Sequence, residues 1–182
     1  MKKIIFTLLS LGFFVVASAQ KVLPEIKLGT TLSAVAYVQG QQFPLVMVVK
    51  SVTAPVILSW SVDGFGEGSF EINEKGLQSG TTMFAGQPSP GSTKLGDTET
   101  YGLISKAAFK SLVDNKTFAY NGKQFKLVTP DTKPMKLSGK EIDALHVIND
   151  EKVELWILNN ANFPLVLQTA GMPIDIVISD IK

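Results

Sequence analysis

The chain of 182 residues lacks cysteine and arginine and holds a single histidine, His146. Without cysteine it can have no thiol nucleophile, no disulfide framework and no cysteine-held metal cluster. One histidine also excludes zinc sites that need two or three imidazole ligands. All 17 basic residues are lysines, so the two-pronged guanidinium contact that suits phosphates and carboxylates is missing. The composition therefore argues against most catalytic and metal-dependent classes of protein.

The charges nearly cancel, with 17 basic and 16 acidic residues and a formal net charge of +1. Proteins that bind nucleic acid or anionic membranes normally concentrate basic residues on one surface. We therefore expect no nucleic-acid partner, and the inventory of side chains predicts neither a cofactor nor a metal.

Residues 1–19 have the three-part pattern of a secretory signal peptide. Two lysines are followed by an apolar run over residues 4–16 and then by the small residues Ala17-Ser18-Ala19. The apolar run is too short to span a bilayer comfortably, so we predict a cleaved signal rather than a transmembrane anchor. Residues 20–182 are then expected to form one exported domain, large enough to be stable without disulfides.

Beyond Thr31, short apolar runs recur about every ten residues, separated by glycine, proline, asparagine and aspartate. That spacing is typical of an antiparallel all-β domain. The sharpest turn signal is Asn121-Gly122, which suits a tight hairpin because both residues tolerate positive φ. The predicted strands are Thr31–Val38, Phe43–Val52, Val56–Val62, Glu67–Asn73, Leu77–Phe84, Thr117–Tyr120, Lys123–Val128, Glu141–Ile148, Lys152–Leu158, Phe163–Thr169 and Ile174–Ile181.

One segment has helical rather than strand periodicity. Ser105 can cap a helix that begins at Lys106, with an apolar face formed by Ile104, Ala108, Phe109, Leu112 and Val113. Residues 85–98 and 129–139 are rich in proline and are expected to be irregular, and a loop as long as the first is a candidate lid. The predicted fold is mainly β: an antiparallel curved sheet or half-barrel of about eleven strands with one short helix.

Few side chains in the sequence point to catalysis or metal binding. A Ser-His-Asp triad using His146 is formally possible, but no G-x-S-x-G motif appears. We therefore expect His146 to face the core or its rim, where its loss would alter stability more than function. Asp63, Glu67 and Glu71, spaced four apart, could seat calcium or an acid/base pair, although a glycine-rich turn with solvated carboxylates is the simpler interpretation.

The aromatic residues are more informative. Trp60 and Trp156 lie in predicted strands whose two faces are both largely apolar, which occurs when one face packs on the core and the other lines a cavity or contacts a partner. The alternative is that these are ordinary core residues. The candidate apolar lining of a ligand site is Trp60, Phe65, Phe70, Met83, Phe84 and Trp156.

The stretch Trp156-Ile157-Leu158-Asn159-Asn160, followed by Pro164-Leu165 and a last strand over residues 174–181, resembles the closing strands of a family of exported bacterial proteins of unknown function. That family is similar in fold to the periplasmic lipoprotein carriers, whose β half-barrel wraps around helices and shields acyl chains. The resemblance is strongest over residues 100–182. It implies a half-barrel with an apolar concave face, and it favours the periplasm over the extracellular medium.

Together these observations predict a soluble exported binding protein, not an enzyme, that shields a lipid or acyl-like apolar ligand on a concave sheet. One alternative is an interaction or structural module for another protein of the bacterial envelope. A remoter alternative is a hydrolase that uses His146 with a serine and an aspartate.

Overall fold

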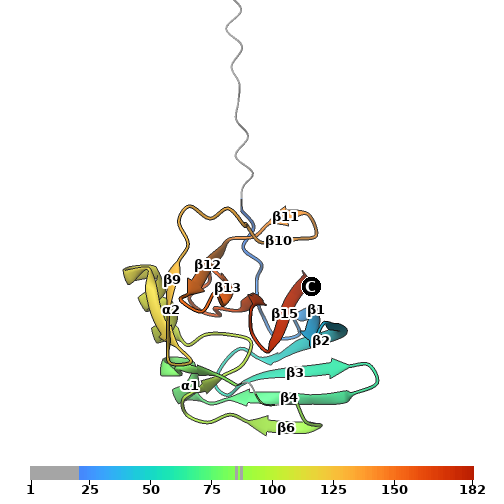
Figure 1. The fold of residues 1–182 in the computed structure, drawn as a ribbon. Helices are drawn as coiled ribbons and strands as arrows, with labels where there is room; N and C mark the ends of the chain where they lie inside the picture. The colour runs from blue at the N-terminus through green and yellow to red at the C-terminus, as the bar shows by residue number, and fades with distance from the viewer. Residues whose placement is uncertain (1–20, 85, 87) are drawn as a thin grey trace, which may run out of the picture.

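The structure, a computed structural model, describes residues 21–84, 86 and 88–182 and contains one large sheet of eleven strands (Figure 1). The predicted signal peptide, residues 1–19, lies outside the described residues. The strands of the large sheet are β1 (Thr31–Val38), β2 (Gln41–Ser51), β3 (Val56–Val62), β4 (Gly66–Ile72), β6 (Gly91–Lys94), β8 (Thr117–Tyr120), β9 (Lys123–Leu127), β12 (Ala144–Asn149), β13 (Glu154–Leu158), β14 (Val166–Ala170) and β15 (Ile174–Ile181).

Four short strands and two helices complete the fold. β5 (Thr82–Met83) pairs with β7 (Glu99–Thr100), and β10 (Lys136–Leu137) pairs with β11 (Lys140–Glu141). The helices are α1 (Glu74–Ser79) and α2 (Lys106–Asn115), which lie next to each other at one side of the molecule (Figure 1). Neither helix, in the part of the chain that is described, is long and apolar enough to cross a membrane.

The large sheet is open and mixed. Its strand order is β6-β4-β3-β2-β1-β15-β14-β13-β12-β9-β8, with β6 and β8 at opposite ends. Neighbouring strands are antiparallel except β4 and β6, which are parallel. The predicted mainly β fold is therefore confirmed, but the expectation of a purely antiparallel sheet is wrong. The chain between β4 and β6 is long enough to cross over and return in the same direction, as a parallel pair requires.

Strands with strong apolar patterns occur where the sequence predicts them. The bounds of β1, β3, β8 and β15 match the predictions. The Asn121-Gly122 turn between β8 and β9 is also confirmed, with φ of 53° and 69°.

The predicted strand Leu77–Phe84 is wrong, because most of its first half belongs to α1. The side-chain oxygen of Asn73 accepts a hydrogen bond from the Gly76 backbone N–H at 2.9 Å, which caps a helix at this point. The described residues accordingly contain two helices instead of the one expected.

The second helix follows its prediction closely. It begins at Lys106, and the Ser105 hydroxyl accepts a hydrogen bond from the Ala108 N–H at 3.3 Å. The same hydroxyl donates to the Gly80 carbonyl at 2.7 Å, which ties the start of α2 to the end of α1. Val113, expected on the apolar face, is instead 41% exposed.

Both segments expected to be irregular contain strands. β6 lies within residues 85–98 and β10 within residues 129–139. Both strands are short and pair through backbone atoms, and of their side chains only that of Leu137 is buried. Their sequences therefore lack the alternation of apolar side chains from which a strand is predicted.

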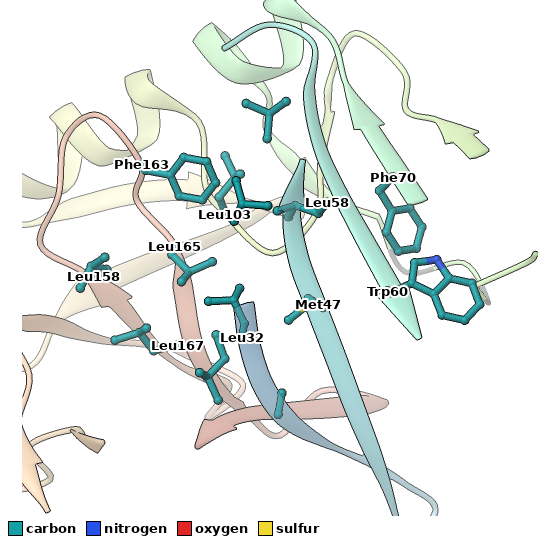
Figure 2. Packing of buried hydrophobic residues seen from close by; sticks show 14 of the residues in the cluster. Leu32, Met47, Leu58, Trp60, Phe70, Leu103, Leu158, Phe163, Leu165 and Leu167 are labelled. Atoms are coloured by element: carbon teal, nitrogen blue, oxygen red, sulfur yellow. The ribbon is translucent and has the colours of Figure 1, made fainter. Parts of the chain in front are cut away.

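The buried apolar residues form two clusters that meet at β13. Leu155 and Ile157 of β13 pack in the smaller cluster beneath α2, while Trp156 and Leu158 pack in the larger one. Figure 2 shows part of the larger cluster, where side chains of β1, β2 and β3 meet those of the segment around β14. β13 thus buries both of its faces, as the sequence predicts for the strand of Trp156.

Candidate functional site

A loop that crosses over one face of the sheet forms the first part of the candidate site. We call residues 129–142, between β9 and β12, the strap. Backbone hydrogen bonds fix the residues that flank it: the Val128 N–H donates to the His146 carbonyl at 2.9 Å, and the Asp143 N–H donates to the Val22 carbonyl at 2.8 Å. The side chains of Met135, Leu137 and Ile142 are buried in the larger cluster, so apolar packing anchors the strap as well.

The single histidine connects the strap to the sheet. His146 lies on β12 and is only 4% exposed. Its Nδ1 is 2.9 Å from Oδ1 of Asp131 in the strap, and its Nε2 is 2.7 Å from Oε2 of Glu154 on β13. Its ring stacks on the neighbouring Trp156, with centroids 4.3 Å apart and an interplanar angle of 6°. The prediction that His146 faces the core is confirmed, and the structure adds two carboxylates that the sequence did not associate with it.

Lys133 of the strap completes this polar cluster. Its ammonium group lies 2.9 and 3.0 Å from the two carboxylate oxygens of Glu154. Its backbone carbonyl accepts a hydrogen bond from Trp156 Nε1 at 2.9 Å, and its backbone N–H donates to Asp131 Oδ1 at 2.9 Å. The hydrogen bond from Lys133, with a further one from His146, holds the pKa of Glu154 below its ordinary value against the effect of burial. We refer to Asp131, Lys133, His146 and Glu154 as the charged cluster.

An open cleft of about 610 Å³ lies beside the charged cluster, between the strap and the sheet. β14 and β15 are paired only at Gln168 and Val177. Both of these residues line the cleft. Its lining combines apolar surface with a few polar groups. The residues are Lys133, Pro134, Met135, Lys136, Glu154, Trp156, Gln168, Ala170, Val177, Ile178 and Ser179.

The geometry of His146 bears on what the cluster can do chemically. Histidine acts as a general base towards serine only if one ring nitrogen faces the hydroxyl. Both nitrogens of His146 face carboxylates instead. In the described part of the chain, no group of three or more histidine and acidic side chains is arranged to hold a metal ion. The cluster is thus suited to joining two segments electrostatically.

Three of the six predicted lining residues lie together at the far end of the larger cluster. Phe70 is fully buried, and its ring centroid is 5.5 Å from that of Phe84 and 3.9 Å from that of Tyr101. Trp60, 4% exposed, lies beside Phe70 (Figure 2). These side chains are packed against one another, and the cleft is not lined by any of them.

The other three predicted residues are dispersed. Phe65 is 66% exposed at the turn between β3 and β4 and contacts Phe43 edge to face. Met83 packs at the edge of the smaller cluster. Trp156 alone of the six predicted residues lines the cleft. A second, smaller cavity of about 200 Å³ near the start of α2 is lined by none of the six.

Sequence reasoning found His146 and Trp156 but missed Asp131, Lys133 and Glu154. Glu154 could have been found, because alternation along β13 places it on the same face as Trp156. Asp131 and Lys133 belong to a segment rich in proline and polar residues, so no periodic pattern marks their position. Of the carboxylates considered from spacing alone, Glu71 hydrogen bonds with Ser92 of β6.

Comparison of the chain with protein families, with curated protein sequences and with solved structures finds no match. The resemblance to the lipoprotein-carrier fold therefore stays a prediction, and the charged cluster and cleft are interpreted from their own geometry.

Proposed function

We propose that this chain is an exported binding protein that holds an amphiphilic ligand with an acyl-like apolar part in the cleft beneath the strap. The observation that supports the proposal is the cleft of about 610 Å³, which falls within the range of about 300–1,000 Å³ typical of small-molecule sites. The likeness to a lipid-shielding half-barrel and a periplasmic location are parts of the same proposal.

The lining of the cleft suits such a ligand. Met135, Trp156 and Ile178 provide apolar surface, and methionine adapts to chains of irregular shape. Lys136 at the same cleft provides positive charge for a carboxylate or phosphate head group, whereas Lys133 is paired with Glu154. The proposed ligand therefore places its chain against the sheet and its anionic head near the strap.

A dansyl-labelled long-chain fatty acid tests the proposal directly. In a Trp60→Phe protein, Trp156 is the only tryptophan. A probe in the cleft should therefore receive energy from Trp156 and fluoresce on excitation of the indole. Ala170→Phe should fill the cleft and weaken binding at least tenfold, because Ala170 lies in the lining.

Gln124→Phe is the matched control, since Gln124 is exposed on β9 and is not part of the cleft lining. It should bind the probe as well as the parent protein does. Absence of energy transfer in the Trp60→Phe protein would contradict the proposal. So would equal binding of the probe after the Ala170→Phe substitution is added.

A second candidate function, contact with another envelope protein, is favoured by Phe65. A side chain of this size that is 66% exposed at a hairpin turn, next to Phe43, offers an apolar contact point. A photo-crosslinker placed at position 65 should capture one defined protein in cells, whereas the same group at Gln124 should not. Equal labelling at both positions would reject this candidate.

A further inference from the structure

The strap is joined to the sheet by charge as well as by packing. Two members of the charged cluster, Asp131 and Lys133, belong to the strap, and the other two, His146 and Glu154, belong to β12 and β13. Each strap residue contacts a group of opposite charge on the sheet when the imidazole is protonated. One of the two charge contacts of the strap, that of Asp131, therefore depends on the protonation state of the imidazole.

The hydrogen-bonding capacity of imidazole makes this dependence definite. Neutral imidazole carries one N–H donor and one lone pair, whereas the imidazolium ion donates at both nitrogens. Both nitrogens of His146 lie within hydrogen-bonding distance of a carboxylate, at 2.9 and 2.7 Å. Both contacts are satisfied only by the imidazolium ion. In the neutral form, a lone pair of the ring must face a lone pair of Asp131 or of Glu154.

We propose that His146 is a pH-operated latch, which in its protonated form holds the strap closed over the cleft and in its neutral form releases it. The latch regulates access to the cleft, so its purpose rests on the proposed function. Its operation can be measured without any ligand.

Among the described residues, the charged side chains that contact His146 are those of Asp131 and Glu154. The strap contributes Asp131 and Lys133, and Lys133 is already engaged by Glu154 of β13. Trp156, which covers one face of the ring, is uncharged. On β9, the other neighbour of β12, the charged residue Lys126 is opposite Ile148 and pairs with Asp150 at 3.7 Å. Loss of the His146 proton therefore removes a charge-assisted hydrogen bond to a carboxylate, and none of these neighbours replaces it.

The proposed latch responds to pH because the two carboxylates beside His146 require a donor at both ring nitrogens, which only the protonated ring supplies. A hydrogen bond to a charged group corresponds to roughly a tenfold change in an equilibrium. We therefore expect the opened fraction of the strap to rise about tenfold as the pH increases through the titration of His146.

Nuclear magnetic resonance can follow the latch in the ligand-free protein. Because the chain has one histidine, its imidazole C–H signals are unique and report the titration directly. The backbone amides of residues 131–133 and 135–137 report the strap through their heteronuclear NOE. The proposal expects these NOE values to fall with rising pH, at the midpoint of the imidazole titration. The NOE values of β13 should stay unchanged.

Variants separate the latch from general stability. The pair Asp131→Asn and Glu154→Gln together should leave the strap amides equally mobile at low and high pH. Glu151→Gln, which alters a surface pair with Lys123 on the adjoining turn, is the matched control and should titrate like the parent protein.

Two results on the unmodified protein would overturn the latch: strap amides that keep their NOE values while the imidazole C–H signals shift with pH, or imidazole signals that do not change over the pH range in which the protein is folded. The latch and the proposed function fail separately. Binding of the fatty-acid probe with a strap indifferent to pH rejects only the latch. A strap that opens in a protein that binds no probe rejects only the proposed function.

Discussion

The two tryptophans occupy similar strands but very different surroundings. Both are buried in the larger cluster, at 4% exposed for Trp60 and 5% for Trp156. Trp156 donates its Nε1 hydrogen to the Lys133 carbonyl and stacks on His146. In contrast, Nε1 of Trp60 is buried without a hydrogen-bond partner among the described residues.

Two tryptophans that are buried alike thus differ in their polar contacts, because different segments of the chain lie against them. Close to Trp60 lie Gly68 and the backbone of residues 89–91, which press closely on the sheet. Over Trp156 lies the strap, which brings a carbonyl acceptor and charged side chains. We call Trp60, Phe70, Phe84 and Tyr101 the Trp60 region, and Trp156 with the charged cluster the Trp156 region. We therefore regard the Trp60 region as structural and the Trp156 region as the candidate functional region.

The largest effect on this comparison is expected from Phe70→Ala. Phe70 is fully buried in the Trp60 region and stacks on Tyr101. Removal of a buried phenylalanine ring should lower the free energy of unfolding by about 3–5 kcal/mol, measured by urea denaturation. Phe65→Ala, at the exposed tip, is the control and should cost less than about 1.5 kcal/mol. Equal losses would show that burial does not distinguish the two rings.

Gly68→Ala should have the next largest effect. A Cβ at this position would lie 2.6 Å from the Gly91 carbonyl oxygen, 2.8 Å from the Ser89 carbonyl oxygen and 2.9 Å from the Trp60 ring. Two of these atoms belong to the backbone, so β6 must shift, at a cost of about 1–3 kcal/mol in urea denaturation. Ser69→Ala on the same strand serves as the control. An unchanged stability would mean that β6 does not press on the Trp60 region.

Parallel Trp→Phe substitutions compare the two regions directly. Trp156→Phe removes the hydrogen bond to the Lys133 carbonyl, whereas Trp60→Phe removes an N–H group that has no partner in the described structure. We expect Trp156→Phe to cost about 1–2 kcal/mol more than Trp60→Phe in urea denaturation. The reverse order would contradict the assignment of the polar network to Trp156.

The smallest effects are expected from titration, and both contributions are fully present near neutral pH. Because Lys133 lowers the pKa of Glu154, this carboxyl contributes stability above its ordinary pKa of 4.5, and the contribution is lost as the pH falls through the lower folded value. Burial raises the pKa of Tyr101, in the Trp60 region, from 10.0 to about 12. Its contribution is present below pH 10.0 and is lost as the pH rises towards about 12.

Urea denaturation as a function of pH distinguishes these two groups. Glu154→Gln should flatten the acid limb of the stability curve and leave the alkaline limb unchanged. Tyr101→Phe should flatten the alkaline limb in part, because burial also raises the pKa of Tyr120 to about 12. If both substitutions altered the same limb of the curve of stability against pH, the two regions would not differ in the pH range over which they contribute stability.

Part of the candidate site could be predicted from the sequence. His146 is the only histidine, and alternation within its strand places it on an inward face, so its burial follows from local pattern. Its partners do not, because Asp131 is 15 positions away, in a segment without periodicity. The wrong strand prediction at Leu77–Phe84 has a similar origin: the sequence pattern places Asn73 at the end of the preceding strand, whereas in the structure its side chain caps α1.

The sequence by itself determined the features that depend on neighbouring residues. The Asn121-Gly122 turn, the Ser105 cap and the apolar strands such as β3 and β15 follow from local backbone preferences and side-chain alternation. Only the tertiary structure decided the parallel pairing of β6 with β4, the course of the strap and the charged cluster. These features join distant segments through backbone and polar contacts, whose energies depend on distance in space and leave no periodic trace along the chain.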